Sequence, residues 1–177
     1  MNEKNNARSS LFLMELIIAV FFFSLAAAVC IRLFASAHLT AEKTTNLSHA
    51  TVWSQNLAEA FYAGKGDISG ISQIYTTAYS TPDTVILFFD KNWNLYGEST
   101  TDASYEAILT ASKRKASDVY SDVTDYNTNL KGDAMVGDIA IIDIRNTSDV
   151  ISSMPKDSKD IIFSCSVDYY GAGKEAE

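Results

Sequence analysis

The stretch that decides the fold is Leu11–Ile31, which reads LFLMELIIAVFFFSLAAAVCI and contains one charged residue, Glu15. Its 21 residues would form a helix about 31 Å long, because an α-helix rises about 1.5 Å per residue. That length matches the hydrocarbon core of a bilayer, so we predict a transmembrane helix over residues 11–31. A carboxylate in such a span costs about 2.5–3.5 kcal/mol on insertion scales, and we therefore expect Glu15 to have a functional role.

A short segment with two basic residues, Lys4 and Arg8, precedes the apolar run. Basic residues stay preferentially on the cytoplasmic side of a membrane. Residues 1–10 are therefore predicted to be a cytoplasmic leader of a single-pass protein in the cell membrane, with the later domain outside. Two other interpretations are a signal peptide cut near Ala26–Ala28 and a lipoprotein signal ending at Cys30. A retained span is favoured because the run exceeds the about 7–15 apolar residues of a signal peptide and helical patterning continues beyond it.

The helix is predicted to continue past the membrane to Tyr62, because residues 32–62 contain no Gly or Pro. Residues spaced three or four apart form one mostly apolar stripe, which consists of Leu47, Ala50, Ser54, Leu57 and Phe61. Trp53 and Ala60 lie beside this stripe. The opposite side carries polar residues, namely Glu42, Lys43, Asn46, Gln55, Asn56 and Glu59. These patterns predict an amphipathic helix over residues 32–63, ended by Gly64-Lys65-Gly66.

The rest of the chain, residues 64–177, is predicted to be an extracytoplasmic β-rich domain. Five segments have strand-like composition or alternation: Thr84–Asp90, Leu95–Ser99, Ser104–Ser112, Asp138–Arg145 and Asp160–Tyr169. Residues 113–136 are predicted to be a long loop with a short helix. Short strands joined by polar loops favour an antiparallel sheet with one buried face, which the amphipathic half of the helix would cover. The predicted fold class is α+β, with a long N-terminal helix, transmembrane and then amphipathic, packed on a small antiparallel sheet.

Composition argues against several functions. The net charge of −8 and the pI near 4.7 disfavour binding to nucleic acid or to anionic lipid. The one basic cluster, Lys113–Lys115, is predicted to be a solvated loop or strand end. Cys30 and Cys165 fall on different predicted elements, so we expect no disulfide between them. Cys165, on an alternating strand, is predicted to be a buried small apolar residue.

Signals for catalysis or metal binding are weak. His38 and His49 lie about 16 Å apart along one predicted helix, too far to share a metal ion. The segment Asp90–Asn94 begins like a calcium loop, but Leu95 stands where a Gly is required and Thr101 where a bidentate Glu is required. An Asx-rich hairpin turn explains it better. We predict no enzyme activity, no catalytic residue, no metal site and no cofactor.

The segment Ser10–Leu16, SLFLMEL, resembles the cleavage and methylation motif of type IV prepilins and pseudopilins. In that family a basic leader ends in a small residue, usually Gly, and a Glu is the fifth residue after the scissile bond. The resemblance places that bond between Ser10 and Leu11 and makes Glu15 the fifth residue. It implies cleavage by a prepilin peptidase followed by N-methylation of Leu11. The chain departs from the family in having Ser10 instead of Gly, Phe12 where Thr is common, and no Pro in the span.

The resemblance also implies a pilin-like fold and a structural role. The chain would be a minor pilin or pseudopilin of a type IV pilus, type II secretion or DNA-uptake filament. Its partners would be the prepilin peptidase, other pilin or pseudopilin subunits and membrane lipid. Glu15 would pair with the Leu11 amine of a neighbouring subunit and set the filament register. The alternative is a membrane-anchored extracellular binding domain that does not polymerise, in which Glu15 only reaches toward the lipid headgroups.

Overall fold

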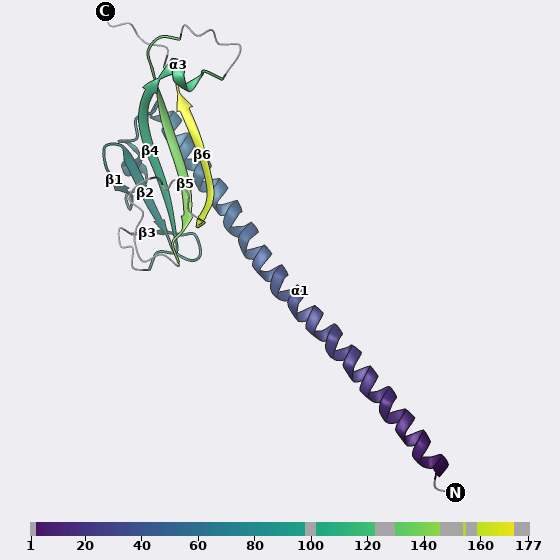
Figure 1. Ribbon diagram of the computed structural model, residues 1–177. Helices are drawn as coiled ribbons and strands as arrows, with labels where there is room; N and C mark the ends of the chain where they lie inside the picture. The colour runs from purple at the N-terminus through teal and green to yellow at the C-terminus, as the bar shows by residue number, and fades with distance from the viewer. Residues whose placement is uncertain (1–2, 98–101, 123–129, 146–153, 155–158, 172–177) are drawn as a thin grey trace, which may run out of the picture. The chain divides into compact units, whose positions relative to one another are not determined.

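The computed structural model describes residues 3–97, 102–122, 130–145, 154 and 159–171, with side chains from residue 11 onward. The chain divides into two compact units, which we call unit 1 (Met1–Thr45) and unit 2 (Asn46–Glu177). The elements, shown in Figure 1, are α1 (Glu3–Ala63), α2 (Ile71–Ile74), β1 (Tyr79–Ser80), β2 (Thr84–Phe89), β3 (Leu95–Tyr96), β4 (Tyr105–Lys115), α3 (Ala116–Val119), β5 (Asp133–Asp143) and β6 (Ile161–Tyr169). This is the predicted α+β arrangement, a long N-terminal helix with a small antiparallel sheet.

The predicted continuous helix is confirmed, and helical backbone also covers residues 3–10. α1 ends in the hydrogen-bond pattern of a Schellman motif, in which the Gly66 N–H donates to the Phe61 carbonyl (2.9 Å) and the Lys65 N–H to the Tyr62 carbonyl (3.0 Å). Lys65 (φ 55°) and Gly66 (φ 86°) both have left-handed backbone. Gly66 also makes room for Met135, because a Cβ at residue 66 would lie 2.4 Å from the Met135 Cβ.

The buried stripe of α1 in unit 2 differs from the predicted one at its first position. The buried residues are Asn46, Ala50, Ser54, Leu57 and Phe61. Leu47 is 46% exposed, so its predicted burial is wrong, and the prediction that Asn46 lies on the polar side is also wrong. Burial of Asn46 depends on hydrogen-bond donors from Trp93 and Tyr105, which helical periodicity does not reveal.

The described strands form an antiparallel sheet in the order β1-β2-β4-β5-β6, with β3 also paired to β2. The longest pairing joins β4 and β5, from Tyr105↔Asp143 to Lys115↔Asp133. The two ends of the predicted 113–136 loop, residues 113–115 and 133–136, are therefore strand, and the short helix expected there is α3. Residues 123–129 of that predicted loop lie outside the described residues. The strand ends resemble loops in sequence because their charged side chains pair across the strands, as Lys113 does with Asp133 (2.9 Å). Lys113–Lys115 lie at an exposed strand end, as predicted.

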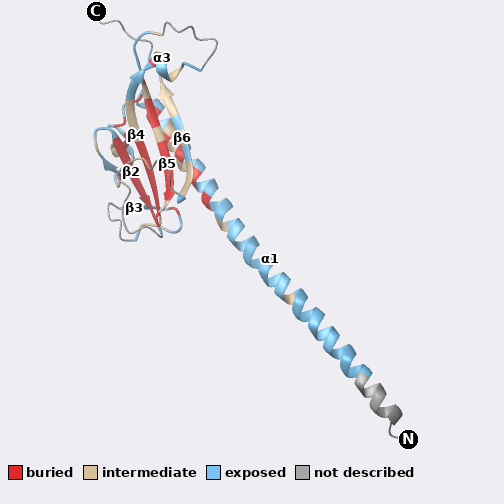
Figure 2. Cartoon of the chain, in the orientation of Figure 1, coloured by how far each residue is buried: buried red, intermediate tan, exposed pale blue. Residues whose placement is uncertain are grey.

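The sheet has two buried apolar faces, so the prediction of one buried face is wrong. Residues 46–63 of α1 cover the first face, where the central strands contribute Val85, Leu87, Phe89, Ala107, Leu109, Ile139 and Ile141. On the second face Met154 and Ile161 pack against Ile86, Phe88, Ile108, Ala140, Ile142 and Ile144. Figure 2 shows β2, β4 and β5 as the buried centre of the sheet. The cause is visible in β2, whose run TVILFF is buried at every position instead of alternating.

An irregularity in β6 alters the predicted alternation. The pairing with β5 shifts between Ile141↔Phe163 and Ile142↔Ile161, which leaves Ile162 as an extra residue. Ile162 packs against the core beneath α1 together with Phe163. Its predicted place on the opposite face is therefore wrong, whereas Phe163, Cys165, Val167 and Tyr169 pack against that core as predicted.

Replacing Ser54 by alanine is expected to raise the free energy of unfolding by about 1 kcal/mol. Ser54 is 2% exposed and, among the described residues, its hydroxyl has no hydrogen-bond partner. Alanine removes that buried hydroxyl and has the higher helix propensity. The measurement is chemical denaturation of the full chain in detergent micelles. Ser48→Ala, at an exposed position of the same helix, reports the propensity effect alone, and equal stabilisation by both changes would contradict the burial argument.

Candidate functional site

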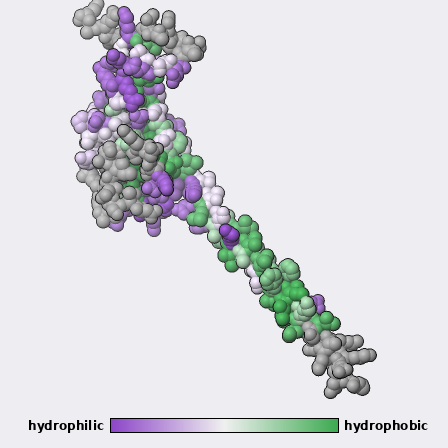
Figure 3. Space-filling model, viewed as in Figure 1, coloured by the Kyte–Doolittle hydropathy of each residue, from purple (hydrophilic) through white to green (hydrophobic). Residues whose placement is uncertain are grey.

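The helix of unit 1 exposes apolar side chains on all sides. From Leu11 to Leu39, its large apolar side chains that are exposed range from 45% for Ile18 to 78% for Phe34. Figure 3 shows this hydrophobic surface along α1. An isolated helix that is apolar all round requires an apolar environment, either lipid or other helices. α1 is long and apolar enough to cross a membrane.

Glu15 is the one charged residue of Leu11–Ile31, and it is exposed on this apolar surface. It lies four residues after Leu11, on the same side of the helix and about 6 Å further along the axis. Within the described residues its carboxylate has no hydrogen bond and no ion pair. Ser24 differs, because its hydroxyl donates to the Val20 carbonyl (2.8 Å) and is thus satisfied inside its own helix. The described residues of α1 thus supply no such bond for Glu15.

The three predicted site residues are close together on α1. Ser10 and Leu11 are consecutive helical residues, and Glu15 follows one turn later. The side chain of Ser10 lies outside the described residues. The geometry places the predicted scissile bond and the lone carboxylate on adjacent turns, while cleavage, methylation and pairing remain predictions.

The turn after β2 has the Asx geometry expected for Asp90–Asn94. The Asp90 carboxylate accepts hydrogen bonds from the backbone N–H groups of Asn92 (2.8 Å) and Asn94 (2.9 Å), and from the Asn94 side-chain amide (3.1 Å). These bonds, the Asn94 side-chain bond first, hold the pKa of Asp90 below its ordinary value, with Lys91 adding to the effect. The carboxylate oxygens thus bind the turn's own amide groups.

Asp90 is expected to make the stability of unit 2 depend on acidic pH. Because its pKa is lower folded than unfolded, its contribution is complete above the unfolded value of about 3.9 and is lost as pH falls through the folded value. The Tm of Asp90→Asn should therefore lie below that of the parent at neutral pH and converge with it in acid. Thermal denaturation across this range measures it. Asp122→Asn controls for removal of one negative charge, and a Tm difference independent of pH would contradict the expectation.

A buried aromatic cluster joins this turn to α1. The Trp93 ring stacks on Tyr105 at 4.1 Å, and both side chains donate hydrogen bonds to Asn46 Oδ1, at 3.2 Å from the indole and 3.1 Å from the phenol. The exposed His49 ring stacks on Trp93 at 5.4 Å, and the Arg145 guanidinium lies 5.3 Å from the Tyr105 ring centroid. Sequence reasoning missed this cluster. The available signal was Trp93 itself, a large aromatic residue inside an Asx-rich turn.

Arg145 is held near Tyr105 by Asp143. Its guanidinium Nη2 lies 2.6 Å from an Asp143 carboxylate oxygen, and its Nε donates to the other oxygen at 2.9 Å. Burial raises the pKa of Asp143, but the hydrogen bonds and the charge of Arg145 outweigh burial and lower the pKa below its ordinary value. This ion pair thus holds the Arg145 guanidinium beside the Tyr105 ring of the aromatic cluster.

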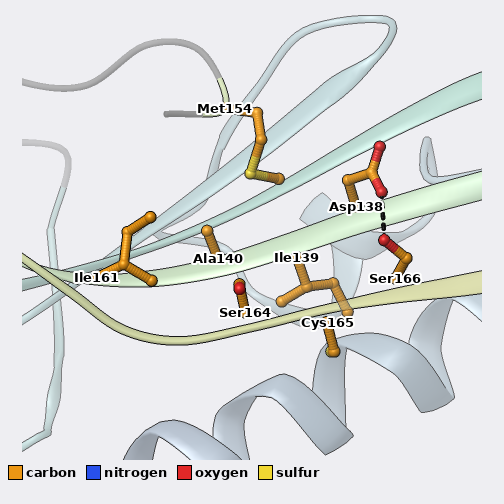
Figure 4. A pocket seen from close by; sticks show the side chains of 8 residues that line it. All are labelled: Asp138, Ile139, Ala140, Met154, Ile161, Ser164, Cys165 and Ser166. Carbon is orange, nitrogen blue, oxygen red and sulfur yellow. Dashed lines mark hydrogen bonds between the residues drawn. The ribbon is translucent and has the colours of Figure 1, made fainter. Parts of the chain in front are cut away.

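A shallow hollow lies on the second face of the sheet, between β5 and β6 (Figure 4). Its main polar contact is a hydrogen bond of 2.5 Å from Ser166 to Asp138, which also binds Arg114 at 3.2 Å. Cys165 points toward α1 instead, is half-buried, and has a pKa that burial raises, which disfavours the reactive thiolate. Over the described residues no three His, Cys, Asp or Glu side chains are placed to hold a metal ion. The hollow thus lacks an activated nucleophile among its described side chains.

No protein-family model, no curated protein and no solved structure matches this chain. Prepilin membership therefore stays a resemblance, carried by about residues 4–40. The feature that singles out a functional site is the lone carboxylate of Glu15 on the exposed apolar helix.

Proposed function

We propose that this chain is a filament subunit of the pilin type, a minor pilin or pseudopilin anchored in the cell membrane by α1. The observation that carries the proposal is Glu15, an exposed carboxylate on an apolar helix, one turn from Leu11. A simple membrane anchor would be more stable in lipid without this charge. A second subunit would offset this cost by supplying an ion-pair partner for the carboxylate.

Processing would supply the partner for Glu15. Hydrolysis of the peptide bond between Ser10 and Leu11 leaves a free α-amine on Leu11, which N-methylation keeps basic. In a filament, this amine of one subunit would pair with Glu15 of its neighbour and offset the cost of each charge among apolar helices. The exposed apolar side chains of residues 11–39 would supply the packing, and the charge pair would set the axial register.

The fold supports the proposal without deciding it. A long helix on a small antiparallel sheet is the arrangement that the resemblance implies, but one fold hosts many functions. The proposed partners are a prepilin peptidase, other pilin or pseudopilin subunits, and membrane lipid. The machine served would be a type IV pilus, a type II secretion system or a DNA-uptake filament, with unit 2 outside the cell.

The mature N-terminus tests this function. Mass spectrometry of the chain purified from its own membranes is expected to find N-methylated Leu11. Ser10→Gly, which restores the family's common residue, is expected to speed cleavage, whereas Ser9→Gly serves as the matched control beside the bond. An intact Met1 would instead support a non-polymerising anchored domain. A chain starting near Val29 would indicate a removed signal peptide.

A further inference from the structure

Trp93 has a backbone conformation that its side chain disfavours. Its φ of 63° lies in the left-handed region, which bulky residues rarely adopt. Its side chain is nevertheless 6% exposed, whereas its neighbours Lys91, Asn92 and Asn94 are exposed. A residue persists in such a conformation only where its surroundings hold it there.

The contacts that hold Trp93 come from three separate elements. α1 contributes Asn46, whose Oδ1 accepts the indole N–H, and the imidazole of His49, which lies nearly parallel to the indole at 16°. β4 contributes the Tyr105 ring, nearly parallel at 11°, and β2 contributes Phe89 at 5.7 Å. Asn46 is central, because one oxygen atom accepts from both Trp93 and Tyr105.

The remainder of the hairpin makes shallower contacts than Trp93 does. Half-buried Tyr96 packs against the apolar cluster on the second face, and its hydroxyl donates to the Asp102 carboxylate (3.4 Å). β3 consists of two residues, which pair as Phe88↔Tyr96 and Phe89↔Leu95. The Asp90 hydrogen bonds are internal to the turn, and Leu95 is 37% exposed. Elements with few buried contacts open locally at a lower free energy than a core does. Trp93 is thus the most deeply buried residue of residues 90–96.

We propose that residues 90–96 form a latch that closes on the first buried turn of α1 in unit 2. In the closed state Trp93 is inserted between His49 and Tyr105 and bonded to Asn46. In the open state Trp93 is withdrawn, its backbone relaxes from the left-handed region, and Asn46 becomes accessible. Stacking and hydrogen bonding favour closure, while the backbone conformation favours opening, and these opposing contributions give two discrete states. The β4–β5 core stays folded in both.

Hydrogen exchange of the full chain in detergent micelles tests the latch. Asn46→Ala removes the shared acceptor and is expected to speed exchange of the Trp93 and Asn94 amides by about tenfold or more, while β4–β5 amides such as Leu109 change by less than about twofold. In a Trp53→Phe background, where Trp93 is the one remaining tryptophan, acrylamide quenching should increase in parallel. Asn56→Ala makes the same chemical change elsewhere on α1 and is the matched control.

His49→Ala provides a second variant at an exposed position that does not threaten folding. It removes one stacking partner of Trp93 and is expected to speed exchange of the same two amides by a smaller factor than Asn46→Ala does. Exchange that rises equally in the hairpin and in β4–β5 would overturn the latch, because the hairpin would then belong to one cooperative core. Unchanged hairpin exchange and quenching in both variants would overturn it as well.

Discussion

Replacing Glu15 by alanine is expected to abolish incorporation of the chain into filaments while cleavage between Ser10 and Leu11 continues. Loss of the carboxylate leaves the Leu11 amine of the neighbouring subunit unpaired among apolar helices. Breaking a buried ion pair costs about 3–5 kcal/mol, which corresponds to at least about a hundredfold weaker subunit contact. Membrane insertion should not suffer, because the substitution removes the about 2.5–3.5 kcal/mol cost of a charge in the span. Reduced insertion therefore cannot explain the loss of filaments.

The measurement compares the chain in sheared filaments with the chain remaining in membranes, alongside the mass of its mature N-terminus. Ser24→Ala is the matched control, since Ser24 is polar, exposed and in the same span but already bonded within its helix. Glu15→Gln keeps the size of the side chain and removes its charge, so it should behave like alanine. Normal incorporation of either Glu15 variant would show that charge pairing does not set the register.

Replacing Phe61 by alanine is expected to destabilise unit 2 by about 3–5 kcal/mol, the usual cost of deleting a buried aromatic ring. Phe61 is fully buried and is the last core residue of α1. The whole stability of a domain is about 5–15 kcal/mol, so this single change removes a large part of it. Chemical denaturation of the full chain in micelles measures the loss. Tyr62→Ala, next along the helix and 47% exposed, should cost far less, and equal losses would contradict this account of the core.

Gly137 shows how closely the Phe61 ring fits the sheet. A Cβ at residue 137 would lie 3.0 Å from Phe61 Cε2 and 3.1 Å from Val167 Cγ2. Gly137→Ala is therefore expected to cost about 1–3 kcal/mol in the parent chain, the usual penalty for overpacking. In the Phe61→Ala background the added methyl group occupies vacated space, and its cost should fall sharply. Additive effects in this double-mutant cycle would show that the two residues are not coupled.

Local patterns predicted much of the sheet. The alternation in residues 138–145 separated Ile139 and Ile141 from Ala140 and Ile142 correctly, because successive side chains of a strand point to opposite faces. The same alternation does not say what covers each face. The second face is covered by residues outside β5, such as Met154 and Tyr96, which pack against the cluster that contains Ile142 only in the folded chain.

The sequence alone was also enough to find the candidate site at Glu15. Glu15 stands out in the sequence because its cost in an apolar helix depends only on its immediate neighbours and on the solvent around them. The contacts of the proposed latch could not be found from the sequence. Asn46 looks like a surface amide until Trp93, 47 residues later, and Tyr105, 59 residues later, donate to it.

The sequence by itself determined that residues 11–62 form one helix, that the first part of this helix requires an apolar environment, and that Glu15 is the exceptional residue within it. These properties follow from hydrophobicity, helix propensity and spacing, which act over one or two turns. Only the tertiary structure decided that Asn46 is buried, that Trp93 adopts a left-handed conformation, and that both faces of the sheet are covered. The physical reason is that burying a polar group or straining a backbone is tolerated only where distant residues supply the compensating contacts.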